Sequence, residues 1–306
     1  MKMWFLKLHR WLALAFALPL AAVLATGLVL SFGPGRGARA RGGGGTLRAQ
    51  RVEALLSQHD PQGRARALAY RAYDRTLTLG AGRAAGPMVD TASGQARSGP
   101  SVLAVTLGTA RRLHETLLLD AGWLVIGSTT AMLVIIALGV LMGWPRFANT
   151  VSGWHKAMAW SLLPLIVLSP LTGLLIAAGV TFTPRPAASP TAPAAPATLA
   201  EAVRVVGRDH DLSALVWLRP LNGRLVVRLV EGGEYTLHAV TRDGTTPLPR
   251  NWPRLWHEGN FAGAWSAGMN VVLSVAMIGL LVTGLWIWLR RTLKRRARRV
   301  RPYAPA

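Results

Sequence analysis

Four long apolar runs divide the chain, and polar or basic residues bound each of them. Crossing a bilayer takes a helix of about 20 mostly apolar residues, and every run reaches that length. The pattern therefore predicts four membrane-spanning helices, with the two long polar stretches between them outside the bilayer. The runs cover roughly residues 11–32, 121–144, 157–180 and 266–289.

The first run follows Lys2 and Lys7, as the apolar core of a signal peptide would. It is longer than the roughly 7–15 residues of such a core, so we expect it to be retained as an anchor, with a kink at Pro19. The predicted segments are helix 1 (residues 1–32), a first extracytoplasmic domain (33–110), helix 2 (111–146), helix 3 (153–181), a linker with a second extracytoplasmic domain (182–253), helix 4 (254–291) and a basic cytoplasmic tail (292–306).

The two polar stretches have the pattern of small α+β domains. Each begins with a predicted amphipathic helix, over residues 46–58 and 198–208, and a Pro/Ala-rich linker (184–197) precedes the second. Alternating apolar and polar residues then predict short strands, and the residues at 232–233 and 243–244 are typical of hairpin turns. The predicted strands are 66–72, 75–80, 87–91, 215–218, 224–230 and 235–241.

The second half of the chain repeats the first. His9 opens an apolar run that reaches a Thr-Gly pair at residues 26–27, and His155 opens one that reaches a Thr-Gly pair at 172–173. The separation from histidine to threonine is 17 in both runs (26−9 and 172−155). The sequence therefore predicts one helix–domain–helix unit made twice, with both copies facing the same way across the membrane. The Thr-Gly pairs are interpreted mainly as sites of close helix packing.

The basic residues give the chain a formal charge of +22, yet they do not indicate nucleic-acid binding. They are scattered or flank apolar runs that are too long for a soluble protein. Basic flanks face the cytoplasm, and they lie at the N-terminus, at Arg146 and Lys156, and at residues 290–299. Both termini are therefore predicted to be cytoplasmic. The sequence has no cysteine, which excludes disulfides, iron–sulfur clusters and c-type haem but not haem held by histidine.

Four of the seven histidines lie at the ends of the predicted helices. His9 and His155 are at the cytoplasmic ends of helices 1 and 3, and His114 and His257 are at the external ends of helices 2 and 4. A low-spin b-type haem takes two axial nitrogens from facing helices of a bundle, so we predict two haems b, one for each pair. Interfacial histidines are the alternative, but the duplicated two-plus-two arrangement favours ligands.

Other polar residues lie close to these histidines in the sequence. Arg111, Arg112 and Arg254 are expected to contact haem propionates, because a guanidinium binds a carboxylate through two hydrogen bonds. Glu115 and Glu258 directly follow histidines and are expected near a propionate or a neighbouring arginine. Three further histidines are interpreted as ordinary surface or capping residues, namely His59, His210 and His238.

Four motifs in the chain are Leu8-His9-Arg10-Trp11-Leu12 with Thr26-Gly27, Leu113-His114-Glu115-Thr116-Leu117, Gly153-Trp154-His155-Lys156 with Leu171-Thr172-Gly173, and Trp256-His257-Glu258-Gly259 with Thr283-Gly284. Together they resemble the PepSY-associated transmembrane helix proteins, a family that includes bacterial inner-membrane siderophore-iron reductases. The resemblance covers the four predicted helices and, loosely, the external domains, of which the second resembles a PepSY fold and the first departs most from it. It implies b-type haems in a four-helix bundle and electron transfer across the membrane to a ferric substrate outside.

The sequence is thus interpreted as a bacterial inner-membrane protein with two haems b that reduces a ferric chelate, such as a ferric siderophore, on the periplasmic side. Some relatives carry a flavodoxin-like or ferredoxin-reductase-like region after helix 4. No such region follows here, so a separate electron donor is expected, either a quinol or a cytoplasmic reductase. The alternative is a non-enzymatic membrane anchor whose PepSY-like domain binds a partner or regulates a peptidase.

Overall fold

The computed structural model describes residues 2–33, 47–81, 84–118, 120–144, 147–183 and 194–300. The chain folds into two compact units, and each unit contains segments from both halves of the sequence. The helical unit comprises residues 1–31, 109–180 and 268–306, and the sheet unit comprises residues 32–108 and 181–267. Most of the predicted linker, Arg146 and the end of the basic tail lie outside the described residues.

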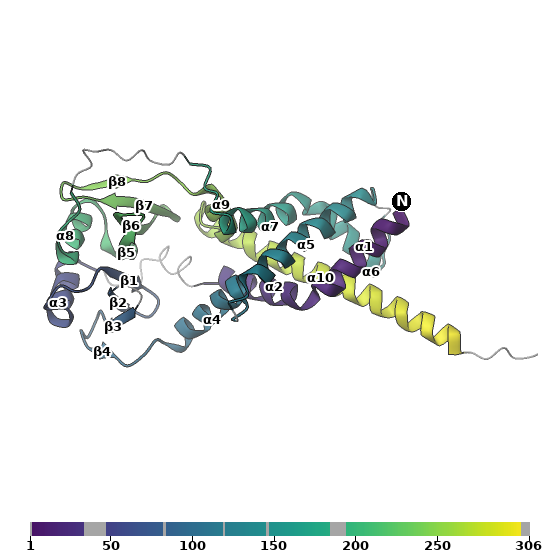
Figure 1. Ribbon diagram of the computed structural model, residues 1–306, viewed down its shortest axis with the longest axis horizontal. Helices are drawn as coiled ribbons and strands as arrows, with labels where there is room; N and C mark the ends of the chain where they lie inside the picture. Colours follow the sequence, from purple (N-terminus) through teal and green to yellow (C-terminus); the bar gives the residue numbers. More distant parts are fainter. Residues whose placement is uncertain are drawn as a thin grey trace, which may run out of the picture. The chain divides into compact units, whose positions relative to one another are not determined.

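The helical unit contains two bent helix pairs and two long single helices (Figure 1). The single helices, α5 and α10, are each long and apolar enough to cross a bilayer. The α1–α2 pair is bent by 68° and the α6–α7 pair by 67°. The described residues therefore contain two candidate spans, or four if each bent pair crosses once. The predicted four-helix bundle stays a prediction. The helices are α1 (Lys2–Ala15), α2 (Ala17–Ser31), α5 (Gly122–Leu141), α6 (Val151–Ser161), α7 (Leu163–Ala177) and α10 (Gly263–Val300).

The two bends occur at the same place in the repeat. They fall at Phe16 and Leu162, which are separated by 146 positions, as are His9 and His155 (162−16 and 155−9). A proline has no N–H to donate to the carbonyl four residues back, and its ring crowds that carbonyl. A proline follows each bend within one turn, at Pro19 in α2 and at residue 164 in α7. The kink predicted near Pro19 is therefore present, and the second half of the chain repeats it.

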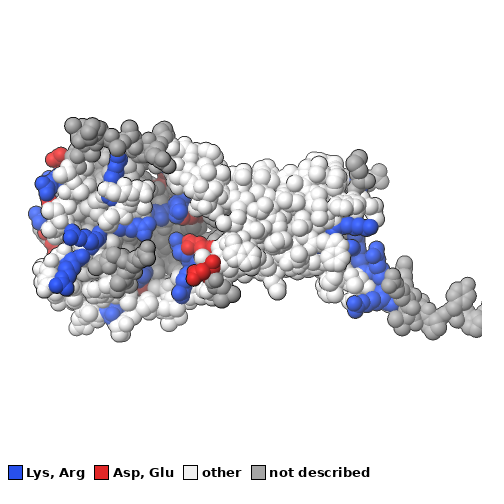
Figure 2. All heavy atoms as spheres, viewed as in Figure 1, with Lys and Arg blue, Asp and Glu red and all other residues white. Residues whose placement is uncertain are grey.

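The helical unit buries a small core and exposes most of its apolar surface. Helices α2, α7 and α10 meet around Leu24, Ile166, Leu273 and Met277, which are all buried. Many other large apolar side chains, including Trp123, are exposed. Figure 2 shows a wide uncharged surface on this unit, with basic side chains gathered at one end. Because a soluble protein rarely exposes so large an apolar surface, the exposed helices identify a multi-pass membrane protein.

The sheet unit contains one antiparallel sheet of eight strands in the order β4-β3-β2-β1-β5-β6-β7-β8. Each half of the chain contributes a four-stranded meander. The meanders join where β1 pairs with β5, with Leu68 opposite Leu218 and Ala69 opposite Trp217. Helices α3 (Ala49–His59) and α8 (Leu199–Asp209) pack against each other. The strands are β1 (Ala67–Arg71), β2 (Thr76–Ala81), β3 (Ala84–Asp90), β4 (Ala96–Arg97), β5 (Leu215–Leu221), β6 (Arg224–Glu231), β7 (Glu234–Val240) and β8 (Thr245–Pro247), and a short 3-10 turn, η2 (Leu212–Ala214), precedes β5.

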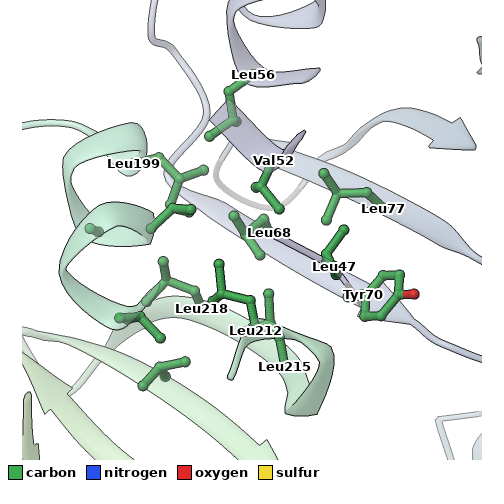
Figure 3. Packing of buried hydrophobic residues seen from close by; sticks show 14 of the residues in the cluster. Leu47, Val52, Leu56, Leu68, Tyr70, Leu77, Leu199, Leu212, Leu215 and Leu218 are labelled. Atoms are coloured by element: carbon green, nitrogen blue, oxygen red, sulfur yellow. The ribbon is translucent and has the colours of Figure 1, made fainter. Parts of the chain in front are cut away.

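Both halves share one hydrophobic core (Figure 3). Val52 and Leu55 of α3, Leu68 of β1 and Leu218 of β5 are at most 1 % exposed and belong to the same cluster. The helices and strands predicted for this region are present, but the two separate domains predicted from the sequence are joined into one. Each meander alone would have two edge strands and would bury little apolar surface. Pairing β1 with β5 removes one edge from each meander and lets both halves share one core.

Candidate functional site

His9 lies on α1 and donates a hydrogen bond to the neighbouring helix α5. Its Nδ1 is 2.9 Å from the carbonyl oxygen of Ile135. A carbonyl can only accept, so Nδ1 carries the proton and Nε2 carries the lone pair. Within the described residues, no hydrogen bond is formed by Nε2 of His9. Gly139 of α5 lies beside the ring, since a Cβ at that position would be 3.9 Å from the His9 Cε1.

His155, the counterpart of His9 in the second half, lies on α6 and bonds to α10. Its Nδ1 is 2.8 Å from Oγ1 of Thr283. The Thr283 hydroxyl donates its own proton to the carbonyl oxygen of Gly279 at 2.6 Å, so its oxygen accepts from the ring. Nε2 again keeps the lone pair and forms no hydrogen bond with the described residues. A Cβ at Gly284 would lie 3.5 Å from the His155 Cε1.

His114 bonds to α2 in a similar way. Its Nδ1 is 3.0 Å from the carbonyl oxygen of Val23 and 3.2 Å from Oγ1 of Thr26. The Thr26 hydroxyl donates to the carbonyl oxygen of Ala22 at 2.6 Å, so it too accepts from the ring. A Cβ at Gly27 would lie 3.3 Å from the His114 Cε1, which is tighter than an ordinary contact. The Thr-Gly pair therefore holds the ring and makes room for it.

The three histidines share a geometry that suits axial ligands of haem iron. A histidine that ligates a metal usually donates its other ring N–H to an oxygen acceptor, which fixes the tautomer and the ring orientation. His9, His114 and His155 all do so through Nδ1. The donor set of the helical unit therefore fits a haem.

His114 and His257 do not lie on the long spanning helices where the sequence predicts them. His114 lies on α4 (Val102–Thr116), which is separated from α5 by a turn, and His257 lies on α9 (Trp252–Glu258), which ends before α10. The turn after α4 contains Leu117, Leu118 and Asp120 with φ of 51°, 64° and 50°, and the C-cap of α9 is Gly259 with φ of 64°. Residues 111–146 and 254–291 thus each form two helices. His257 belongs to the sheet unit.

The family described as the PepSY-associated TM region matches residues 6–291, which is almost the whole chain. The protein belongs to this family. A comparison with curated proteins finds no match. Because the match includes both halves and all four histidine motifs, the duplicated arrangement of this PepSY-associated protein lies within the region that defines its family.

The acidic and basic residues beside the histidines are partly paired with each other. In the PepSY-associated chain, Glu258 accepts hydrogen bonds from Arg254 at 3.1 Å and from Arg228 at 2.9 Å, which confirms the expected arginine neighbour. Glu115 lies 3.9 Å from Arg111 in an exposed i,i+4 pair, which contributes little to stability. Contacts of Arg111, Arg112 and Arg254 with propionates stay a prediction.

The histidines interpreted as ordinary residues behave in two ways. His59 caps a loop, because its Nε2 donates to the carbonyl oxygen of Gly94 at 2.9 Å. His210 and His238 instead converge with Glu231, which the sequence interpretation missed. The predicted turn at 232–233 could have revealed part of this cluster, because the hairpin register puts residues 231 and 238 on one face of the sheet.

Burial and hydrogen bonding act in opposite directions on the Glu231 carboxyl. Burial, the largest single influence, would raise its pKa. Its contacts with the Thr236 hydroxyl, with His210 and with His238 together outweigh that effect and hold the pKa of Glu231 below its ordinary value. Glu231 is therefore ionised at neutral pH.

Proposed function

We propose that this protein is a di-haem b electron-transfer protein of the bacterial inner membrane, with both termini in the cytoplasm, that reduces a ferric chelate in the periplasm. The expected substrate class is a ferric siderophore. The observation that supports this proposal best is the geometry shared by His9, His114 and His155, each of which donates its Nδ1–H to an oxygen on a neighbouring helix. A histidine that only lies at the membrane interface does not require a fixed tautomer or a glycine beside its ring.

In this proposal, His9 and His155 would hold one haem near the cytoplasmic surface, and His114 and His257 would hold the other near the periplasmic surface. Haem b, when bound, supplies a reversible one-electron iron couple. The chain fixes the ring orientations, and donation from Nδ1–H makes the opposite nitrogen a stronger ligand. The sequence repeat supports both pairs, because His155 follows His9 by 146 positions and His257 follows His114 by 143 (155−9 and 257−114).

The surface charge of the sheet unit suits an anionic substrate. Basic side chains form a broad band over this unit in Figure 2, and a positive potential raises the local concentration of anions. Arg111, Arg112 and Arg254 would contact haem propionates, since a guanidinium holds a carboxylate through two hydrogen bonds. The electron donor would be a quinol or a separate cytoplasmic reductase.

The test is a haem and electron-transfer assay on the full chain in detergent, produced with adequate haem supply. We expect about two haems b per chain and split α bands after reduction with dithionite. Anaerobic addition of a ferric hydroxamate chelate should then reoxidise the haems. The gallium form of the same chelate is the matched control, because Ga³⁺ binds like Fe³⁺ but accepts no electron.

Two results would contradict the proposal. A protein that stays free of haem despite adequate supply would instead favour the alternative, a membrane anchor whose PepSY-like region binds a partner or regulates a peptidase. Haems that stay reduced after the ferric chelate is added would support the cofactor assignment but contradict the proposed reductase activity.

A further inference from the structure

Three side chains with metal-binding atoms converge in the sheet unit, from three different elements. His210 follows the last residue of α8, Glu231 ends β6 and His238 lies on β7. One ligand atom from each lies within 4.8 Å of the other two. Nδ1 of His210 is 2.7 Å from Oε1 of Glu231, and Nε2 of His238 is 3.2 Å from Oε2. Both oxygens of one carboxylate therefore face an imidazole nitrogen.

The hydrogen bonds around His210 determine which of its nitrogens carries a proton. The Thr245 hydroxyl donates to Oδ2 of Asp209 at 2.9 Å, so its oxygen accepts from Nε2 of His210, also at 2.9 Å. In the neutral ring this leaves a lone pair on Nδ1. That lone pair faces the carboxylate of Glu231 at 2.7 Å, and two acceptors at this distance require a cation between them. The cation is either a second proton on His210 or a metal ion.

The side chains around the cluster orient its three possible ligands, as the surroundings of a metal site do. His210 is hydrogen-bonded to Thr245, which is hydrogen-bonded to Asp209. Hydrogen bonds of this kind orient the histidine ligands of metal sites. The Thr236 hydroxyl donates to Oε2 of Glu231 at 2.7 Å and so orients the carboxylate. The side chains of His210 and His238 are 14 % and 11 % exposed, whereas that of Glu231 is 37 % exposed. The two imidazoles are thus held inside, and the carboxylate leaves an open side to solvent.

We propose that His210, Glu231 and His238 bind a divalent first-row transition-metal cation of the Zn²⁺ or Fe²⁺ type. Two imidazoles and one carboxylate are the donor set of open zinc and non-haem iron sites, whereas Mg²⁺ and Ca²⁺ take oxygen ligands. Ligand atoms around a tetrahedral zinc ion lie about 3.3 Å apart, so small side-chain movements bring these three atoms into range. The site does not depend on the haem proposal, because it lies entirely within the sheet unit.

The first half of the chain offers an internal control. His59 ends α3, as His210 follows α8, but its Nε2 donates to the carbonyl oxygen of Gly94. Among the described residues, His210, Glu231 and His238 form the only group of three or more metal-binding side chains whose ligand atoms lie within 4.8 Å of one another. Substitution of His59 therefore removes an imidazole at the equivalent position without touching the proposed site.

The test is Zn²⁺ binding to the full chain in detergent, after treatment with a chelator and without a histidine tag. Equilibrium dialysis with elemental analysis is applied to wild type, Glu231→Gln, His238→Gln and His59→Gln. We expect both cluster variants to bind Zn²⁺ at least about tenfold more weakly at this site, and His59→Gln to match wild type. Mg²⁺ should not compete in any of them.

X-ray absorption at the zinc edge is measured on the wild type, so it does not depend on whether a variant folds. Imidazole scattering with only nitrogen and oxygen neighbours is the expected result. The proposal is overturned if wild type binds no Zn²⁺, if the bound zinc lacks imidazole ligands, or if the two cluster variants bind as wild type does. The first result would identify the cation beside His210 as a proton.

Discussion

The hydroxyl oxygen of Thr283 accepts a hydrogen bond from Nδ1 of His155 at 2.8 Å. The same hydroxyl donates to its own helix, so it can only accept from the ring, and Nε2 is left with the lone pair. Thr26 holds His114 in the same way. The sequence pattern indicates that the Thr-Gly pairs are mainly packing sites, whereas in the structure two of the threonines orient candidate ligands.

Replacing Thr283 with valine removes the hydroxyl and keeps the shape of the side chain. We expect the haem proposed at His155 to bind about 10- to 100-fold more weakly, because loss of a residue that hydrogen-bonds to a ligating histidine typically has that effect. Transfer of haem to a scavenging apoprotein measures it. Thr292→Val is the matched control, since among the described residues the Thr292 hydroxyl bonds only to the Trp288 carbonyl of its own helix. Equal haem retention in both variants would show that Thr283 does not position His155.

Alanine substitutions of the histidines test the pairing. His9→Ala and His155→Ala should each remove the same haem, or leave it high-spin, because each axial ligand is needed for the low-spin state. His114→Ala should affect the other haem and leave the first intact. Reduced-minus-oxidised spectra at low temperature separate the two. An unchanged two-haem spectrum in His114→Ala would contradict its role as a ligand.

Glycine-to-alanine substitutions test the space beside the rings. A Cβ at Gly27 would lie 3.3 Å from the His114 Cε1, and one at Gly284 would lie 3.5 Å from that of His155. Gly27→Ala should therefore shift the midpoint potential of its haem more than Gly284→Ala does. Gly127→Ala is the control, since a Cβ there meets nothing within 4 Å among the described atoms. A larger shift in the control than in Gly27→Ala would rule out the steric account.

The two bent helix pairs either cross the membrane or turn back within it. We expect each to cross once, because their apolar lengths match a span. The chain has no cysteine, so single substitutions such as Lys2→Cys and Phe32→Cys can be labelled with an impermeant reagent. The two positions should react from opposite sides, as should Asn149→Cys and Phe182→Cys. Reaction of one pair from the same side would establish a re-entrant loop for that helix pair.

Acid should weaken the turn between β3 and β4. The hydrogen bond from the Ser93 N–H is the main cause that holds the pKa of Asp90 below its ordinary value, with bonds from the Ala92 N–H and the Ser93 hydroxyl adding to it. A carboxyl whose pKa is lower in the folded state stabilises the fold above its unfolded pKa of about 3.9 and loses that effect as pH falls.

The corresponding measurement is urea unfolding of wild type and Asp90→Asn across this pH range. Asp90→Asn should unfold at lower urea concentration near neutral pH. The difference should shrink as the pH falls through the folded-state pKa of Asp90, because the wild-type carboxyl is then neutral as well. A difference that is constant with pH would show that the Asp90 charge plays no part in the turn.

Local patterns predicted most elements of the sheet unit. The strands predicted over 66–72 and 224–230 are present as β1 and β6. They could be predicted because successive side chains of a strand point to opposite faces, so apolar and polar residues alternate along the sequence itself. The breaks after α4 and α9 were not expected. Asp120 and Gly259 adopt positive φ there. The apolar runs begin after both breaks, at about residues 121 and 266, but the residues just before them also fit a helix, so the sequence predicted one continuous helix in each place.

The sequence by itself determined the membrane class, the duplication and the identity of His9, His114, His155 and His257 as candidate ligands, since these follow from composition, spacing and helix length. Only the tertiary structure decided that the two external stretches form one sheet, that Nδ1 of three histidines is bound by neighbouring helices, and that His210 meets His238 at Glu231. These relationships join residues far apart in the chain, and they depend on how strands pair and helices pack. A pattern of near neighbours does not contain that information.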